Sequence, residues 1–115
     1  MLVRVVDATA VSAVLFGDPA ADQIVQQLDD AILVAPTVLE NHLCEICLQR
    51  MHDGEAEESH YLEALGLLQV LDLQVIKQDP GEIVRFAKEY RVSINEAYYL
   101  RLAHAFSAEL VSLNE

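Results

Sequence analysis

The sequence predicts a single α/β domain of three layers, in which helices cover both faces of a mainly parallel sheet. Its 115 residues match the usual length of one domain, so we treat residues 1–115 as one unit. A hydrophobic fraction of 53% and a charged fraction of 23% are typical of a folded core and exclude disorder. Short apolar runs alternate with helical segments along the chain, which is the order of a parallel sheet covered on both sides.

Four short runs of apolar or β-branched residues predict the strands of this sheet. Asp7 closes the first run, and Pro36 closes the second. We therefore expect a sheet of four strands. In chain order they are Leu2–Val6, Ala31–Ala35, Leu73–Lys77 and Glu109–Leu113.

Helix-start signals follow the first two strands. Asp18 and Pro19 supply an N-cap and a first-turn proline for one helix, whose apolar residues share a face. Thr37 and Glu40 have the spacing of a capping box and open a long helix to about Met51. The sequence thus predicts one helix before the second strand and a longer one after it.

The second half of the chain carries further start and stop signals. Gly54 breaks the long helix, and Asp79 followed by Pro80 caps a later one. Ser93 and Glu96 repeat the capping-box spacing. The helices expected here are Glu55–Leu71, Asp79 to about Tyr90, and Ser93 to about Phe106.

The charge is strongly acidic and unevenly distributed. Seven Lys and Arg stand against nineteen Asp and Glu, giving a net charge of −12. Such a chain repels nucleic acid unless a metal or a local basic patch reverses the sign. Residues 18–63 hold eleven acidic residues against Arg50 alone, which suits an Arg-rich partner segment, whereas residues 77–101 carry a net charge of +1. If RNA binds, we expect it along residues 77–101.

No apolar stretch approaches the roughly 20 residues that span a bilayer, and the N-terminus lacks a signal-peptide pattern. Cys44 and Cys47 are the only cysteines and lie in one helical segment, so no disulfide framework is expected. Redox CxxC pairs sit at helix N-termini, whereas these residues lie mid-helix, which favours buried, inert thiols. We expect a cytoplasmic protein.

The candidate functional residues follow from the place where open α/β sheets bind ligands, beyond the carboxyl ends of the strands. That rule selects Asp7 after the first strand and Asn114 after the last. It also selects the starts of the later helices, with His42, Glu45 and Glu96. An oxygen-rich group of this kind suits Mg²⁺ or Mn²⁺, which in turn bind phosphates.

Four segments together resemble a PIN domain, and more narrowly the VapC-type toxins of toxin–antitoxin pairs. They are the opening VVDATAV, the AP before the long helix, SINEAYYLRLA and the closing LVSLN. The resemblance runs the length of the chain and implies a ribonuclease dependent on Mg²⁺ or Mn²⁺. It also implies a homodimer, a small antitoxin as partner, and a parallel sheet of five strands with an acidic site at the strand ends.

The resemblance assigns site roles residue by residue. Asp7 matches the family's first acid, and Thr9 stands where the family often has Ser or Thr. His42, six residues past the proline that ends the second strand, occupies the position of the second acid. Glu96 replaces the third acid and Asn114 the fourth. With fewer carboxylates than the usual site, weaker metal binding is expected.

Each acidic candidate also has a structural interpretation. Asp7 could stop its strand and cap the following turn. Glu96 could reach back to the Ser93 amide as part of a capping box, and Glu40 could do the same toward Thr37. For Glu40 this structural role is favoured.

His42 and Glu45 are spaced by three residues, which brings their side chains together on a helix and matches metal-binding Glu and His pairs of helical bundles. An imidazole ligand would shift the preference toward Mn²⁺, Fe²⁺ or Zn²⁺. The alternative is a solvated face shared with Gln49 and His52, and for His52 this is favoured.

Competing functions are separated by single residues. A haloacid-dehalogenase-like phosphatase needs a second Asp where Thr9 stands, and a phosphorelay receiver needs a Lys where Asn114 stands. The alternative that remains is a PIN-like domain that has lost catalysis and serves as a protein-binding module. His42 and Asn114 at two acid positions support it, and a partner chain could then supply the missing last strand.

Overall fold

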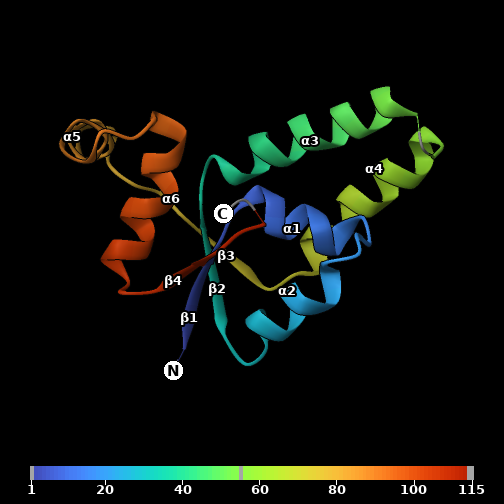
Figure 1. Cartoon of the computed structure of the whole chain (residues 1–115), viewed down its shortest axis with the longest axis horizontal. Coiled ribbons are helices and arrows are strands. Elements are labelled where there is room, and N and C mark those ends of the chain that lie inside the picture. The colour runs from blue at the N-terminus through green and yellow to red at the C-terminus, as the bar shows by residue number, and fades with distance from the viewer. Residues whose placement is uncertain (1, 55, 114–115) are drawn as a thin grey trace.

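The sheet in the computed structural model has four parallel strands, as predicted, and their order is β3-β2-β1-β4 (Figure 1). The structure describes residues 2–54 and 56–113. The strands span Val3–Val6 (β1), Ile32–Pro36 (β2), Leu73–Ile76 (β3) and Glu109–Val111 (β4). Each strand lies within one or two residues of its predicted bounds.

The strand order places a switch point beside β1. The chain moves from β1 through β2 to β3 on one side and then returns to add β4 on the other. Val5 of β1 pairs with Val34 of β2 and with Leu110 of β4. Open α/β sheets bind ligands at the carboxyl ends of the strands where the order reverses. Asp7, which follows β1, stands at that point.

Helices lie on both sides of the strands (Figure 1). α6 contacts β1, β2 and β4, and α5 packs against α6. On the other side, α1 packs against α2 and α3, and α4 packs against α3. The helices span Ala8–Leu15 (α1), Ala21–Leu28 (α2), Leu39–Asp53 (α3), Glu58–Gly66 (α4), Pro80–Tyr90 (α5) and Ile94–Ala105 (α6), and Leu67–Val70 forms a 3₁₀ turn (η1).

Helix α1 corrects the prediction of a single helix between the first two strands. Its sequence, ATAVSAVL, is apolar almost throughout, and six of its eight residues are buried. A helix buried on most sides shows no alternation of apolar and polar faces, so periodicity could not reveal it. Asp7 caps it, because the Asp7 Oδ1 accepts a hydrogen bond from the Ala10 amide at 3.0 Å. The structural interpretation of Asp7 is thereby confirmed.

Two predicted helix starts were wrong. The N-cap of α2 is Ala20, and the Asp18 carboxylate instead binds the Arg50 guanidinium through two hydrogen bonds of 2.9 and 2.6 Å. Helix α3 starts at Leu39 with no side-chain cap, so the capping box expected from Thr37 and Glu40 does not form. An ion pair and a tight turn after β2 override the local signals there.

The other start and stop signals are confirmed. The Asp79 carboxylate accepts from the Glu82 amide at 3.1 Å. Ser93 and Glu96 form the reciprocal capping box. Gly54 ends α3 in the left-handed conformation with φ of 70°. The long helix expected over Glu55–Leu71 is shorter than predicted, because α4 ends at Gly66 and the chain tightens into η1; Glu55 lies outside the described residues.

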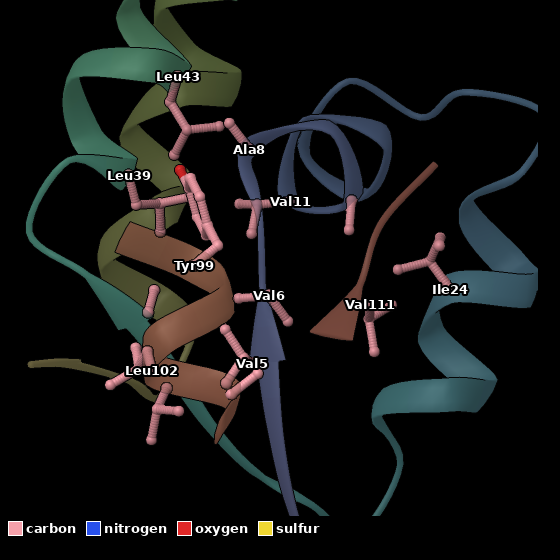
Figure 2. Packing of buried hydrophobic residues seen from close by; sticks show 14 of the residues in the cluster. Val5, Val6, Ala8, Val11, Ile24, Leu39, Leu43, Tyr99, Leu102 and Val111 are labelled. Carbon is pink, nitrogen blue, oxygen red and sulfur yellow. The ribbon is translucent and has the colours of Figure 1, made fainter. Parts of the chain in front are cut away.

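The main core gathers around β1. Val5 and Val6 of β1 lie between α6 on one side and α1 with Ile24 of α2 on the other (Figure 2). Tyr99 of α6 enters this core, and its ring reaches toward Leu43 of α3. The core therefore ties α3 and α6, which carry candidate site residues, to the strand that precedes Asp7.

The two cysteines of α3 differ in burial. Cys47 is buried, and burial raises the pKa of its thiol, but Cys44 is exposed, so only one of the two thiols is enclosed as predicted. Both are free. Among the helices of residues 2–54 and 56–113, none is long and apolar enough to cross a membrane.

Candidate functional site

One open pocket at the carboxyl end of β1 brings together predicted site residues from two helices, α3 and α6, and from a strand end. Asp7, His42, Glu45 and Glu96 all line it, and its volume is about 320 Å³. Asn114, the remaining predicted site residue, lies outside the described residues. The other lining residues are Ala8, Thr9, Ile46, Asn95 and Tyr99.

Glu40 and His52, two further polar residues of α3, do not line this pocket. Glu40 lines a different pocket, together with Pro36 and Thr37, on the side of β3. His52 is exposed near the end of α3 and does not line the pocket of Asp7, in agreement with the solvated face expected for it.

Asp7 is half-buried, and one of its two carboxylate oxygens is used locally. Its Oδ1 accepts from the Thr9 hydroxyl at 2.7 Å and from the Ala10 amide at 3.0 Å. Within the described part of the chain, no hydrogen bond to Oδ2 is found. The same carboxylate therefore caps α1 with one oxygen and keeps the other for a ligand.

Thr9 links Asp7 to the end of the last strand. The Thr9 hydroxyl lies 3.1 Å from the Ser112 hydroxyl and accepts from the Leu113 amide at 2.9 Å. These contacts hold residues 112–113 beside Asp7. The resemblance implied only that a Ser or Thr is common at this position. The link itself joins residues that are 103 and 104 positions apart in the sequence.

Glu96 has both a structural and a pocket-facing position. Its Oε1 accepts from the Ser93 amide at 3.2 Å, and its own amide donates to the Ser93 hydroxyl at 3.0 Å. The side chain is exposed and lines the pocket. The capping box thus fixes the carboxylate at the mouth of α6, so the two interpretations of this residue are compatible.

His42 and Glu45 line the same pocket but contact different partners. The Glu45 Oε1 accepts from the Asn41 side-chain amide at 3.0 Å, on the exposed face of α3. The His42 Nδ1 lies 2.7 Å from the Tyr99 hydroxyl, and the two ring centroids are 5.7 Å apart. Burial, and secondarily the negative charge of Asp7, raise the pKa of the Tyr99 phenol, so it stays protonated. Nothing in the sequence singled out Tyr99, which looks like an ordinary core aromatic residue.

A divalent cation in this pocket would take its protein ligands from the side chains that line it. In residues 2–54 and 56–113, no three His, Cys, Asp or Glu side chains are close enough to form a metal-binding group. Mg²⁺, however, usually keeps several waters and takes one or two carboxylates plus substrate phosphates. Asp7, with its unused Oδ2, and the carboxylates of Glu45 and Glu96 meet that smaller requirement. The pocket therefore fits a divalent cation held by one or two carboxylates together with waters, and no denser ligand set is present in the described residues.

The basic region beyond the pocket is partly neutralised. Arg101 of α6 donates to the Gln78 side-chain oxygen at 3.1 Å and lies 3.8 Å from the Glu82 carboxylate. Arg85 contacts the same carboxylate at 3.3 Å. These contacts hold two of the cations of residues 77–101 close to α5.

The fold of this chain is similar to that of a solved structure, and its sequence matches a family model. The crystal structure of PAE2754 from Pyrobaculum aerophilum is similar, with a TM-score of 0.76 over 99% of this chain and 76% of that chain. The sequence identity is 17%, so this likeness shows the fold alone. No curated protein matches the sequence. The family model described as PIN domain matches residues 4–115. Since that match covers nearly the whole chain, this chain belongs to the PIN domain family.

Proposed function

We propose that this PIN domain is an endoribonuclease of the VapC type, dependent on Mg²⁺ or Mn²⁺, that hydrolyses RNA phosphodiesters. The PIN domain is generally a nuclease fold that binds divalent metals. The observation that carries the proposal is the pocket at the switch point of the sheet, where Asp7 and Glu96 converge from β1 and α6.

The side chains of the pocket have separable roles in this reaction. Asp7 offers Oδ2 for a ligand while Thr9 and the Ala10 amide hold Oδ1. Glu96 offers the carboxylate oxygen that the capping box leaves over, and Glu45 adds a third negative charge at the same pocket. When bound, Mg²⁺ or Mn²⁺ supplies charge neutralisation of the phosphate and a water of lowered pKa. The resemblance implies Asn114 as the fourth residue of the site, and this stays a prediction.

The partners follow from charge and from the resemblance. Residues 18–63 carry eleven acidic residues against Arg50, and this surface suits an Arg-rich segment of an antitoxin. Arg50 is itself bound to Asp18, which leaves the acidic character of the region intact. We further propose a homodimer, as the resemblance implies.

A second candidate is a PIN domain without catalysis that binds a protein partner. It is favoured by the absence of a grouped ligand set in the described part of the chain and by His42 at an acid position. The two functions differ in one prediction, since only the nuclease releases RNA fragments when metal is added.

The test is cleavage of a labelled single-stranded RNA by the purified protein in EDTA, Mg²⁺ and Mn²⁺, with Asp7→Asn in parallel. Asn keeps a side-chain oxygen for the cap of α1 but removes the charge, so the variant should fold. Cleavage that requires metal and is lost in Asp7→Asn supports the nuclease. Equal activity of the two proteins identifies a contaminating nuclease, and no cleavage in either metal supports the binding module.

A further inference from the structure

Tyr99 has an unusual environment for a residue beside a polar pocket. Its side chain packs in the core, with 7% of its surface exposed, and its hydroxyl end points toward α3 (Figure 2). In the part of the chain that the structure describes, the hydroxyl makes one hydrogen bond, to His42 Nδ1 at 2.7 Å. The direction of that hydrogen bond decides which nitrogen of His42 carries its proton.

A hydroxyl that is largely shielded from water and fails to donate gives up a hydrogen bond that is costly to leave unmade. If His42 Nδ1 carried the proton, it would donate to Tyr99, and only a water of the open pocket, with no acceptor among the described residues, would be left for the phenolic proton. If Tyr99 donates, both groups are satisfied, and the neutral imidazole keeps its proton on Nε2. The geometry therefore favours Tyr99 as donor and the Nε2–H form of His42.

A proton on Nε2 would make His42 a hydrogen-bond donor in a pocket whose other charged groups are negative. The other ionisable side chains of the pocket, apart from Tyr99, are the carboxylates of Asp7, Glu45 and Glu96, all of which repel a phosphate group. Since Nδ1 is bound to Tyr99, Nε2 is the ring nitrogen left for a pocket ligand. In the Nε2–H form this nitrogen has no lone pair for a metal, but it can donate a hydrogen bond.

We propose that His42 donates a hydrogen bond from Nε2–H to a phosphate oxygen of RNA bound in the pocket, with Tyr99 as the positioning residue. This rests on the proposed function, because it names the RNA group that the same pocket contacts. A position that the resemblance assigns to a metal-binding acid thereby becomes a substrate-binding donor.

The first experiment determines the tautomer by long-range proton–nitrogen NMR on the ¹⁵N-histidine-labelled full chain, with His42→Ala to assign the signals. The Nε2–H form is expected in the wild type and in Tyr98→Phe, a matched control that removes a phenolic hydroxyl group from the same helix. Tyr99→Phe should give averaged signals of both tautomers. An Nδ1–H form in the wild type, or spectra unchanged by Tyr99→Phe, would overturn the assignment.

The second experiment measures binding of a short fluorescent single-stranded RNA in Ca²⁺, a divalent cation that offsets the charge of the pocket carboxylates, with EDTA as the metal-free reference. His42→Ala should weaken binding about tenfold, the effect of losing a hydrogen bond to a charged group. His42→Gln keeps an N–H donor and should recover most of that loss, and Tyr98→Phe should bind like the wild type. Wild-type affinity in His42→Ala, or no RNA binding by the wild type, would overturn the proposal.

A third measurement separates this role from metal ligation. Mn²⁺ affinity should change less than about twofold in His42→Ala, because a protonated Nε2 does not ligate. A loss as large as in Asp7→Asn would show His42 to be a ligand and overturn the proposal. The two proposals can fail separately. If the wild type cleaves RNA and His42→Ala binds RNA as tightly as the wild type, only the proposed role of His42 is refuted. If RNA binding depends on His42 but no RNA is cleaved, only the proposed nuclease function is refuted.

Discussion

Helices α3 and α6 both begin near the carboxyl edge of the sheet, and they begin in different ways. Ser93 precedes α6 in an extended conformation, with φ of −67° and ψ of 162°, and its side chain and that of Glu96 close a capping box. Val38 precedes α3 with helical angles, φ of −75° and ψ of −10°, and no side chain caps that helix. An N-cap side chain reaches the first amides only from an extended backbone.

The difference follows from how the chain arrives at each helix. Strand β2 runs to Pro36, so α3 follows after only two residues, and the turn places Val38 in the helical region already. At α6 the chain leaves α5 through Arg91, whose φ of 57° reverses its direction before Ser93. The outcome is that Glu96 is held at the pocket, whereas Glu40 lies in another pocket.

At the start of α1, a single side chain, that of Asp7, both caps the helix and lines the pocket. Its substitution gives the largest predicted effect. Asp7→Asn should lower metal-dependent RNA cleavage by about 100-fold, because a metal-facing charge is lost. The melting temperature should stay close to that of the wild type, since Asn also caps helices. Asp7→Ala should show the same loss of cleavage and a lower melting temperature. Cleavage retained by Asp7→Asn would mean that Asp7 is only a cap.

The capped start of α6 predicts a separation of metal binding from stability. Glu96→Gln should weaken Mn²⁺ binding about tenfold by titration calorimetry, because a carboxylate becomes a neutral amide. Gln also serves in capping boxes, so the free energy of unfolding should change little. An Mn²⁺ affinity unchanged in Glu96→Gln, with the wild type binding the ion, would restrict this residue to its capping role.

The two starts can be compared directly by removing their hydroxyl groups. Ser93→Ala should destabilise the protein by about 1 kcal/mol in urea unfolding, the usual value of a lost N-cap. Thr37→Ala should change stability by less than about 0.5 kcal/mol, as for an ordinary exposed site. Equal losses in the two variants would show that α3 is capped by Thr37 in solution.

The smallest predicted effect concerns the acid position on α3. His42→Asp should raise Mn²⁺ affinity about threefold, because it adds a carboxylate beside Asp7 in place of a nitrogen tied to Tyr99. Gln49→Asp is the matched control, since it adds the same charge to α3 away from this pocket. An equal gain in both variants would indicate a general effect of charge.

Periodicity and short apolar runs were sufficient to predict the strands and most helices, because those signals act over a few residues. The rule for the carboxyl ends of parallel strands then placed Asp7, His42, Glu45 and Glu96 together, and they share one pocket. Helix α1 was missed because its residues are buried on most sides and lack a polar face. Asn114 stays a prediction, since it lies outside the described residues.

What the sequence determined by itself is the α/β class, the four parallel strands and the acidic residues at their carboxyl ends. What only the tertiary structure decided is how each of those residues is used. His42 and Tyr99 are separated by 57 positions and meet because α3 and α6 pack around β1. The physical reason is range: strand and helix signals are local, whereas a hydrogen bond between distant residues depends on the packing of the whole core.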